Sequence, residues 1–431
     1  MQDLTSFIDS SPSPFHAVQT LKKRLEEAGF QQLFESDAWA MQPHRSYFTI
    51  RGGKTIVAWK CGALPIVNQG FRILVAHTDS PTIKVRPNPH IVSGNNRLLS
   101  VDVYGGPLLY TWLDRDLKLS GVVYTADKNT GGIKTSMVDL TDFPVRAPSL
   151  AIHLSRGLKD TGFKINPQTD LNLLFAQNGE DVALTLNDVL AEVCKVPAES
   201  IVSYDLRVAD TQASGYIGAD KSFISAPRLD NLFSCYGIME SLLAVSAQKL
   251  DQTVMAVWFD AEEIGSHTQT GARSNFLDSI LLRIVCASPA SGAEDFHRAK
   301  AHSAMLSVDM AHAEHPAFKD RTDENHVPFM NKGLALKHSS SANYGDSGTV
   351  AAWFLNACRS HDVPLQRFAY RCDHGGGSSL GSIVSLTGIR TIDVGAPMLS
   401  MHSIRELAGR KDVDLSIKAY NLFLNQPLII D

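Results

Sequence analysis

Apolar residues recur at helical spacing near the N-terminus. Within "SPSPFHAVQTLKKRLEEAGF" they fall every three or four residues and form a single stripe, made of Phe15, Val18, Leu21 and Leu25. Ser13 followed by Pro14 is typical of a helix start, and Gly29 is typical of a helix end. This stretch therefore predicts a capped amphipathic helix whose apolar face packs on a core.

Other apolar runs are continuous, which is typical of strands covered on both faces. They include "RILVA", "VMAVWF" and "AMLSV", and they alternate with helical patterns such as residues 231–248. This alternation predicts an α/β fold with a mostly parallel sheet. Between about residues 86 and 219 the runs are shorter and interrupted by Gly, Asn and Asp, which favours a mainly β unit. We predict a discontinuous α/β domain of residues 1–85 and 220–431, with residues 86–219 inserted as the β unit.

Histidines and carboxylates cluster at the ends of the apolar runs in the α/β domain. Ligands bind at the carboxyl ends of strands in such sheets, because loops and helix ends converge there. We therefore expect five separate segments to contribute to one site. In chain order the candidate residues are His77, Asp79, Asp230, Glu262, Glu263, Asp309 and His402.

Two imidazoles with several carboxylates are a donor set for zinc or a mixed transition-metal site. These donors are too many for one four-coordinate ion, and they suit two ions that share a bridging carboxylate. Such chemistry also needs a carboxylate that takes a proton from the attacking water. In an extended turn neighbouring side chains point apart, so Glu262 and Glu263 are expected to divide these two roles.

Each signal also has a simpler interpretation. The run "VWFDAEEIGS" by itself fits a solvated acidic loop, and Asp230 fits a helix N-cap. Three further histidines near Asp309 are irregularly spaced and are interpreted as exposed loop residues: His312, His315 and His326. The combination of all five segments, rather than any one of them, predicts the metal site.

Rival functions remain open at this level. The same two-metal core serves aminopeptidases, deacylases and carboxypeptidases, since all of them activate water against an amide. A serine hydrolase is a different class: Gly377 to Gly381 matches G-x-S-x-G around Ser379, and Asp393 and His402 follow in the α/β-hydrolase order. That hypothesis leaves the five metal-type segments without a function. A metal-storage protein is a third class, but storage requires no base beside the metals.

Composition and charge limit the classes of partner that we expect for this chain. The chain has 431 residues, 44% hydrophobic and 20% charged, as expected for a globular protein of two or three domains. A net charge of -5 gives no reason to expect nucleic acid or an anionic membrane as a partner. No apolar run approaches the ~20 residues of a membrane span, and the N-terminus does not resemble a signal peptide. The six scattered cysteines suit a reducing compartment, so we expect a cytoplasmic protein.

With these residues identified, the chain resembles the M18 family of metallo-aminopeptidases, the aspartyl aminopeptidase and vacuolar aminopeptidase I group. The matching segments follow the family's order and span nearly the whole chain: "AHTDSP", "YGGPLLYTWLDRDLKLSG", "LAIHLSRG", "RLDNL", "DAEEIGS", "SVDMAHA" and "LSMHSIRE". The resemblance implies release of N-terminal amino acids from peptides by two zinc ions, which cobalt or manganese is able to replace.

The resemblance also implies a role for each candidate residue. Asp230 bridges the two ions, His77 and Asp309 complete one site, and Glu263 and His402 complete the other. Glu262 is implied as the general base, and Asp79 as the group that orients His77 through its ring N–H. A tetrahedral dodecamer built from dimers is implied as well, with contacts made by the inserted β unit. His153, in "LAIHLSRG", would reach the active site of a neighbouring subunit.

One stretch departs from the family pattern. Members that select acidic residues carry a "QRYA"-like stretch with a preceding lysine, whereas this chain reads "KHSSSANYGDSG". The lysine's place falls on Ser341, with Lys337 and His338 as the nearest candidates for a positive charge. Serine, Asn343 and Tyr344 offer hydrogen bonds without a full charge. We therefore expect a specificity that extends to neutral N-terminal residues.

Overall fold

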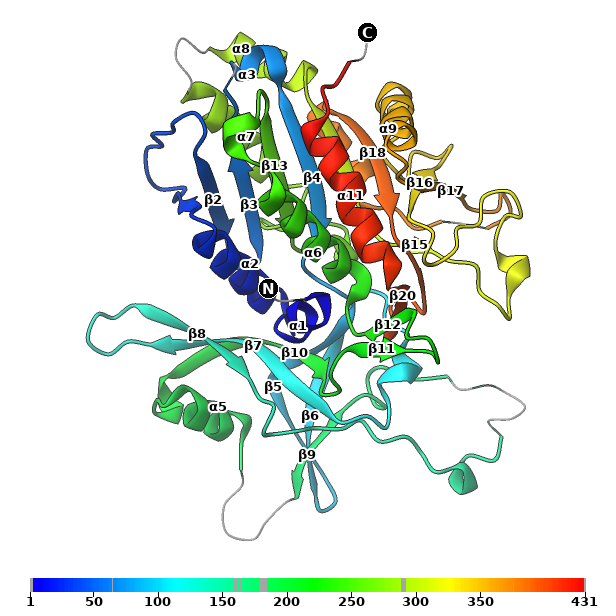
Figure 1. The fold of residues 1–431 in the computed structure, drawn as a ribbon. Coiled ribbons are helices and arrows are strands. Elements are labelled where there is room, and N and C mark those ends of the chain that lie inside the picture. The colour runs from blue at the N-terminus through cyan, green and yellow to red at the C-terminus, as the bar shows by residue number, and fades with distance from the viewer. Residues whose placement is uncertain are drawn as a thin grey trace.

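The largest element of the molecule is a mixed sheet (Figure 1). It is seen in a computed structural model that describes residues 3–63, 65–157, 162, 164–177, 184–287, 292–374 and 376–429. Among these residues the central strands run parallel to one another, as predicted, and antiparallel strands lie towards both edges. The nine strands, in spatial order, are β1 (Gln31–Gln32), β2 (Ser46–Arg51), β3 (Thr55–Lys60), β13 (Thr253–Phe259), β4 (Phe71–His77), β14 (Ala304–Val308), β18 (Arg390–Gly395), β16 (Leu334–His338) and β17 (Leu365–Ala369).

Helices cover both faces of this sheet, which explains its continuous apolar runs. In β13, Ala256 and Trp258 enter the core on one face, whereas Met255 and Val257 enter the core on the other. The first core is closed by α1 (Leu4–Asp9), α2 (Pro14–Glu27), α6 (Leu229–Ala244), α9 (Gly348–Ser360) and α11 (Lys411–Asn425). The second is closed by α7 (Phe276–Cys286), α8 (Ala293–Ala301) and α10 (Leu380–Val384), and a short helix, α3 (Ile66–Gln69), precedes β4.

The predicted helices are confirmed, with one difference in length. Helix α2 begins at Pro14, after Ser13, and its buried stripe is the one predicted. Helix α6 ends at Ala244, four residues before the predicted end, because Val245 adopts an extended conformation. The buried Lys60 ammonium donates to the main-chain oxygen of Val245 at 2.5 Å, which satisfies a carbonyl left free at the helix end.

A second, antiparallel sheet lies below the first in Figure 1. Its six strands all fall between Thr82 and Asp210, inside or next to the predicted β unit, whose boundaries stay a prediction. They are β8 (Ile133–Asp139), β7 (Leu117–Ala126), β10 (Ile201–Asp210), β5 (Thr82–Ser93), β6 (Asn96–Tyr104) and β9 (Leu173–Gln177). One helix, α5 (Leu186–Cys194), packs into a core shared with this sheet.

A third, small sheet was not predicted. Its strands are β11 (Gly215–Ile217), β12 (Phe223–Ala226), β20 (Glu406–Gly409), β19 (Pro397–Leu399) and β15 (Ala311–His312). They are two to four residues long, too short to give a strand pattern in the sequence.

The described part of the chain contains no helix long and apolar enough to cross a membrane.

Candidate metal centre and active site

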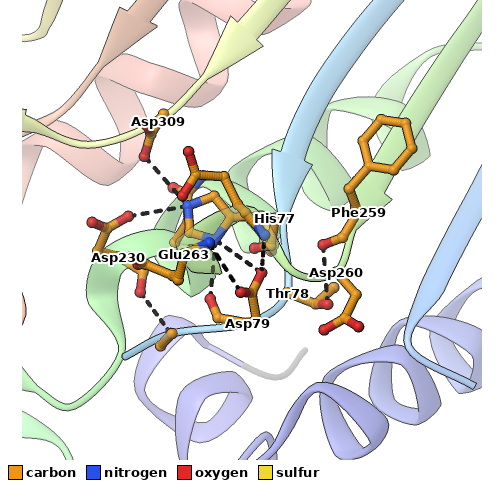
Figure 2. A network of polar contacts seen from close by, with 12 residues as sticks. His77, Thr78, Asp79, Asp230, Phe259, Asp260, Glu263 and Asp309 are labelled. Carbon is orange, nitrogen blue, oxygen red and sulfur yellow. Dashed lines mark hydrogen bonds and ion pairs between the residues drawn. The ribbon is translucent and has the colours of Figure 1, made fainter. Parts of the chain in front are cut away.

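The strand ends of the large sheet bring the candidate ligands together (Figure 2). His77 ends β4, Asp230 lies in the first turn of α6, and Asp309 follows β14. Glu263 follows β13, and His402 lies between β19 and β20. Their ligand atoms form three groups in which all atoms lie within 4.8 Å of one another: His77, Asp230 and Asp309; Asp230, Glu263 and His402; and His77, Glu262 and Glu263.

Asp230 belongs to two of these groups, and its two oxygens face in different directions. Oδ1 lies 3.4 Å from Nε2 of His77, and Oδ2 lies 3.6 Å from Nε2 of His402. On the first side, Asp309 Oδ1 is 3.5 Å from Nε2 of His77. On the second side, Glu263 Oε2 is 3.5 Å from Nε2 of His402. The arrangement is therefore two adjacent sets of donors that share one carboxylate.

Each imidazole is oriented by a main-chain oxygen. Nδ1 of His77 lies 3.0 Å from the main-chain oxygen of Asp79, and Nδ1 of His402 lies 3.1 Å from that of Gly106. Because a carbonyl only accepts, each Nδ1 carries the proton, and each Nε2 lone pair faces the carboxylates. The Asp79 carboxylate is farther from Nδ1 of His77, at 3.6 Å, so the hydrogen bond is made by the main-chain oxygen of the same residue.

The Asp79 carboxylate instead holds the loop that carries the adjacent glutamates. Oδ1 accepts from the main-chain N–H of Glu262 at 3.1 Å, and Oδ2 accepts from that of Glu263 at 3.2 Å. The Tyr104 hydroxyl also donates to Oδ2, at 2.8 Å. Asp79 is fully buried, so these hydrogen bonds replace its contact with water.

The two glutamates lie in a 3-10 turn, Glu262–Ile264, and the expected extended turn is wrong. Ala261 at φ 64° and Gly265 at φ 87° both take left-handed conformations, which coil the chain between them. The two side chains share one group with His77, but only Glu263 also joins the group around His402, and Glu262 belongs to neither group that shares Asp230. The third carboxylate of the stretch, Asp260, pairs with Lys54 at 2.9 Å.

A second buried carboxylate, Glu406, has no counterpart in the sequence-based prediction. Its Oε2 accepts from the main-chain N–H of Asp230 at 3.0 Å, and its Oε1 accepts from that of His402 at 2.7 Å. Glu406 thus joins two segments that are about 170 positions apart in the chain. The "HSIRE" segment was a signal for it, since a glutamate four residues after a candidate ligand is a natural hydrogen-bond acceptor for the same loop.

The electrostatics of the cluster suit a bound cation. Burial, together with neighbouring carboxylates, raises the pKa of Glu262 to about 8 and that of Glu263 well above its usual value. Burial opposes ionisation of Asp230 too, but His402 and His77 outweigh it and lower the pKa of Asp230. Within the described part of the chain, Asp230 Oδ1 and Glu263 Oε1 are buried and accept no hydrogen bond. Buried oxygen and imidazole donors without other partners fit zinc ions.

A cavity of ≈ 220 Å³ opens beside this cluster. Its wall includes Lys337, His312, Tyr344 and Tyr370, together with Glu262. His312 was interpreted as an exposed loop residue, which is wrong: its ring packs against Phe368, and Nε2 lies 3.1 Å from the Tyr370 hydroxyl. The short strand β15 turns this histidine inward, whereas His326 is exposed and pairs with Asp323.

The cavity wall also shows which of the candidate specificity residues lie near the cluster. Ser339, Ser340 and Ser341 do not contribute to its wall, whereas Lys337 does. Lys337 points inward from β16 with its side chain 4% exposed, and its Nζ lies 3.7 Å from Asp309 Oδ2. His338, the next residue on the strand, points outward and is exposed. A positive charge is therefore present in the cavity, and it is supplied by Lys337.

The serine hydrolase hypothesis is contradicted. Ser379 is fully buried, and its hydroxyl donates to Asp393 Oδ1 at 2.5 Å. It also caps α10 by accepting from the N–H of Gly381. His402, the required base, instead faces Asp230 and Glu263. A nucleophile must be exposed and bonded to its histidine, so Ser379 has a structural role.

His153 lies apart from the cluster within one chain. It sits in a 3-10 turn, Ile152–Leu154, that belongs to an exposed segment of the region between β8 and β9. Its neighbours Ile152 and Leu154 are 52% and 76% exposed. Large apolar side chains exposed together are typical of a protein contact surface.

Fold and site together define a metal-dependent hydrolase with an α/β catalytic sheet. The family model for the aminopeptidase I zinc metalloproteases (M18) matches residues 7–424, and the chain belongs to this family. It is 38% identical over 428 residues to a probable M18 family aminopeptidase 2 of Pseudomonas paraeruginosa (strain DSM 24068 / PA7), covering 98% of this chain and 97% of that relative. The expected family and the expected metallo-aminopeptidase activity are thereby confirmed, and the deacylase, carboxypeptidase and storage alternatives lose their support.

Solved structures of the same family superpose closely. A cryo-EM structure of the Ape4 and Nbr1 complex matches with a TM-score of 0.94 at 31% identity, covering 100% of this chain and 87% of that one. A structure described as the mApe1 dodecamer of S. cerevesiae matches with a TM-score of 0.85 at 28% identity, covering 98% of this chain and 95% of that one. The α/β aminopeptidase fold predicted from the sequence is confirmed.

Proposed function

We propose that this aminopeptidase releases N-terminal amino acids with two zinc ions that share Asp230. The observation that carries the proposal is that Asp230 turns one oxygen to His77 and the other to His402. His77 and Asp309 would complete one ion, and Glu263 and His402 the other, with cobalt or manganese able to substitute. When bound, such a pair would polarise the scissile carbonyl and lower the pKa of a water, so that the water gives up a proton more readily.

The remaining steps belong to the chain's own residues. Glu262 would take the proton of the attacking water and return it to the leaving amine, which is supported by its position on the cavity wall outside the two groups that share Asp230. Asp79 fixes the main chain of both glutamates, and Glu406 fixes that of Asp230 and His402. These two carboxylates keep the donor groups in place before substrate arrives.

A hydrolysis panel tests this function. Matched peptides with different N-terminal residues, an N-acetylated peptide and a C-terminally blocked peptide would be followed with and without 1,10-phenanthroline. We expect release of the first residue only, none from the acetylated peptide, and loss of activity with the chelator. Release of C-terminal residues, cleavage of the acetyl group or labelling of Ser379 by a fluorophosphonate would contradict the proposal.

Lys337 leads to a proposal on specificity. A buried carboxylate without a cation costs several kcal/mol, so an acidic side chain needs a fixed positive charge in its pocket. Lys337 supplies one in the cavity beside the metal cluster, and its ammonium lies 5.2 Å from the centre of the Tyr344 ring. In place of the broad specificity expected from the serines, we propose a preference for N-terminal Asp or Glu.

We expect kcat/KM for Asp or Glu to exceed that for Leu and Ala by ~100-fold or more, equivalent to about 2.7 kcal/mol. Lys337→Met should remove this advantage and leave the rate on Leu within about threefold. A fall on all four substrates would instead show that the substitution disturbs Asp309. If the wild-type enzyme had equal kcat/KM for all four N-terminal residues, the specificity would be broad, as expected from the serines, and the proposed role of Lys337 would be wrong.

We also propose a homo-oligomer of about twelve subunits, supported by the fold shared with the mApe1 dodecamer and by the exposed Ile152–Leu154 turn. His153 from a neighbouring subunit would contact the substrate.

His153→Ala should then lower turnover without changing metal content, and sedimentation should give a large assembly for both forms. The exposed His297 of α8 is a matched control, and His297→Ala should behave as wild type. A fully active monomer would contradict this prediction.

A further inference from the structure

The end of strand β6 brings its last residue and the two glycines that follow it to the candidate metal centre. Tyr104, Gly105 and Gly106 contact Asp79, Glu263 and His402, respectively. Asp79 lies between β4 and β5, Glu263 follows β13 of the large sheet, and His402 lies between β19 and β20 of the small sheet. Two of these contacts, from the Tyr104 hydroxyl and the Gly106 oxygen, hold Asp79 and His402, and the "YGG" sequence that provides them lies in one of the family motifs.

Tyr104 acts on the glutamates through Asp79. Its hydroxyl donates to the same Asp79 oxygen that accepts from the N–H of Glu263. The Arg207 guanidinium lies 4.2 Å from the centre of the Tyr104 ring and fixes the ring position. Burial next to Asp79 raises the pKa of Tyr104, so the phenol stays protonated and remains a donor. A change at this hydroxyl is therefore transmitted to the Glu262–Ile264 turn.

The two glycines act on the donors themselves. Gly105 has φ +72° and lies so close to Glu263 that an added Cβ would meet Glu263 Cβ at 3.2 Å and its main-chain oxygen at 3.4 Å. The main-chain oxygen of Gly106 accepts from Nδ1 of His402, which leaves Nε2 free for Asp230 and Glu263. Shortly after, the N–H of Leu108 donates to the main-chain oxygen of His402 at 2.8 Å.

We propose that Tyr104–Gly106 is a positioning segment through which the second sheet sets the orientation of Glu262, Glu263 and His402. The inference rests on the proposed two-metal function. It makes the inserted sheet part of the catalytic apparatus, beyond any role in assembly. A substrate contact is not required of any of the three residues.

Two variants test the segment, each with a matched control from the same sheet. Tyr104→Phe removes only the hydroxyl, and Tyr204→Phe removes a hydroxyl that donates to the main-chain oxygen of Arg86, away from the site. Gly105→Ala adds a methyl group against Glu263. Gly94→Ala adds one at another positive φ, +58°, with no atom within 4 Å.

We expect Tyr104→Phe to speed amide hydrogen exchange over residues 260–265 of the metal-free protein and to lower kcat by ~10–100-fold, with KM changed less than about threefold. Gly105→Ala should weaken zinc binding by ~10–100-fold in competition with a chromophoric chelator. Both controls should match wild type in exchange, zinc affinity and kcat. If Gly105→Ala does not fold, Tyr104→Phe alone decides the question.

Exchange, zinc affinity and kcat of the two variants equal to those of their controls would overturn the positioning role. A different result would contradict the proposed function itself: wild-type protein that binds no zinc or releases no amino acid. Because the exchange measurement uses metal-free protein, the link from Tyr104 to the glutamate turn is tested in either case.

Discussion

Glu262→Gln should lower kcat by ~10²–10⁴-fold while the protein keeps its metal. Glutamine has nearly the same size and still fits beside the cavity, but it cannot take a proton from water. Glu262 belongs to neither donor group that shares Asp230, so its loss should leave both groups complete. Steady-state kinetics and elemental analysis of the same sample, with thermal melting as a folding control, give the result.

The opposite pattern would reverse the assignment of the two glutamates. If Glu262→Gln lost metal and Glu263→Ala kept its activity, Glu263 would be the base and Glu262 the ligand. A Glu262→Gln enzyme with unchanged kcat would mean that the Glu262 carboxylate takes no part in proton transfer.

Asp230→Ala should abolish activity by removing the carboxylate that both donor groups share. Glu263→Ala and His402→Ala each remove a donor from one group only, so we expect them to lose about one ion and most activity. Asp230→Ala is expected to lose both ions. Metal content after dialysis, measured together with kcat, distinguishes these outcomes.

The matched control is Asp260→Asn, since Asp260 is a buried carboxylate of the same loop region that pairs with Lys54 outside the donor groups. It should keep its metal even if it melts at a lower temperature. Equal metal loss in Asp260→Asn and Asp230→Ala would indicate that metal loss follows general destabilisation.

The convergence of the candidate ligands could be predicted because most of them lie at the end of a local pattern. His77 and Asp309 end continuous apolar runs, and such runs in an α/β protein end at the same edge of the sheet. Asp230 lies in the first turn of α6, and the residues after it have the apolar composition of a buried helix. The place of these residues at one edge of the sheet follows from the strand and helix patterns, and the distances between their side chains are not needed for it.

The surrounding residues could not be predicted, because long-range pairing decides them. Glu406 belongs to a strand of four residues whose partners lie more than 170 positions away, at β12, and nearby at β19. Lys337 faces the cavity only because β16 pairs with β18 and β17 in the observed register. The 3-10 turn at Glu262 depends on a left-handed Ala261, which no residue preference indicates.

The G-x-S-x-G match is a case in which the sequence suggests a catalytic site that the structure does not form. The glycines and serines before α10 have the spacing of a nucleophile turn, but Ser379 caps the helix and binds a buried aspartate. An added Cβ at Gly381 would overlap Asp393 Oδ2 at 1.7 Å, so this glycine is required for packing. The motif gives no information on burial, and the burial of Ser379 is what distinguishes a structural serine from a nucleophile.

Zinc titration of the metal-free chain tests the central proposal most directly. Activity on a peptide with a free N-terminus and bound zinc would be measured in the same samples, from none to an excess over two ions per chain. We predict no activity without metal and full activity only when close to two ions are bound per chain. Full activity in the metal-free chain, or full activity with a single bound ion, would contradict the two-metal account.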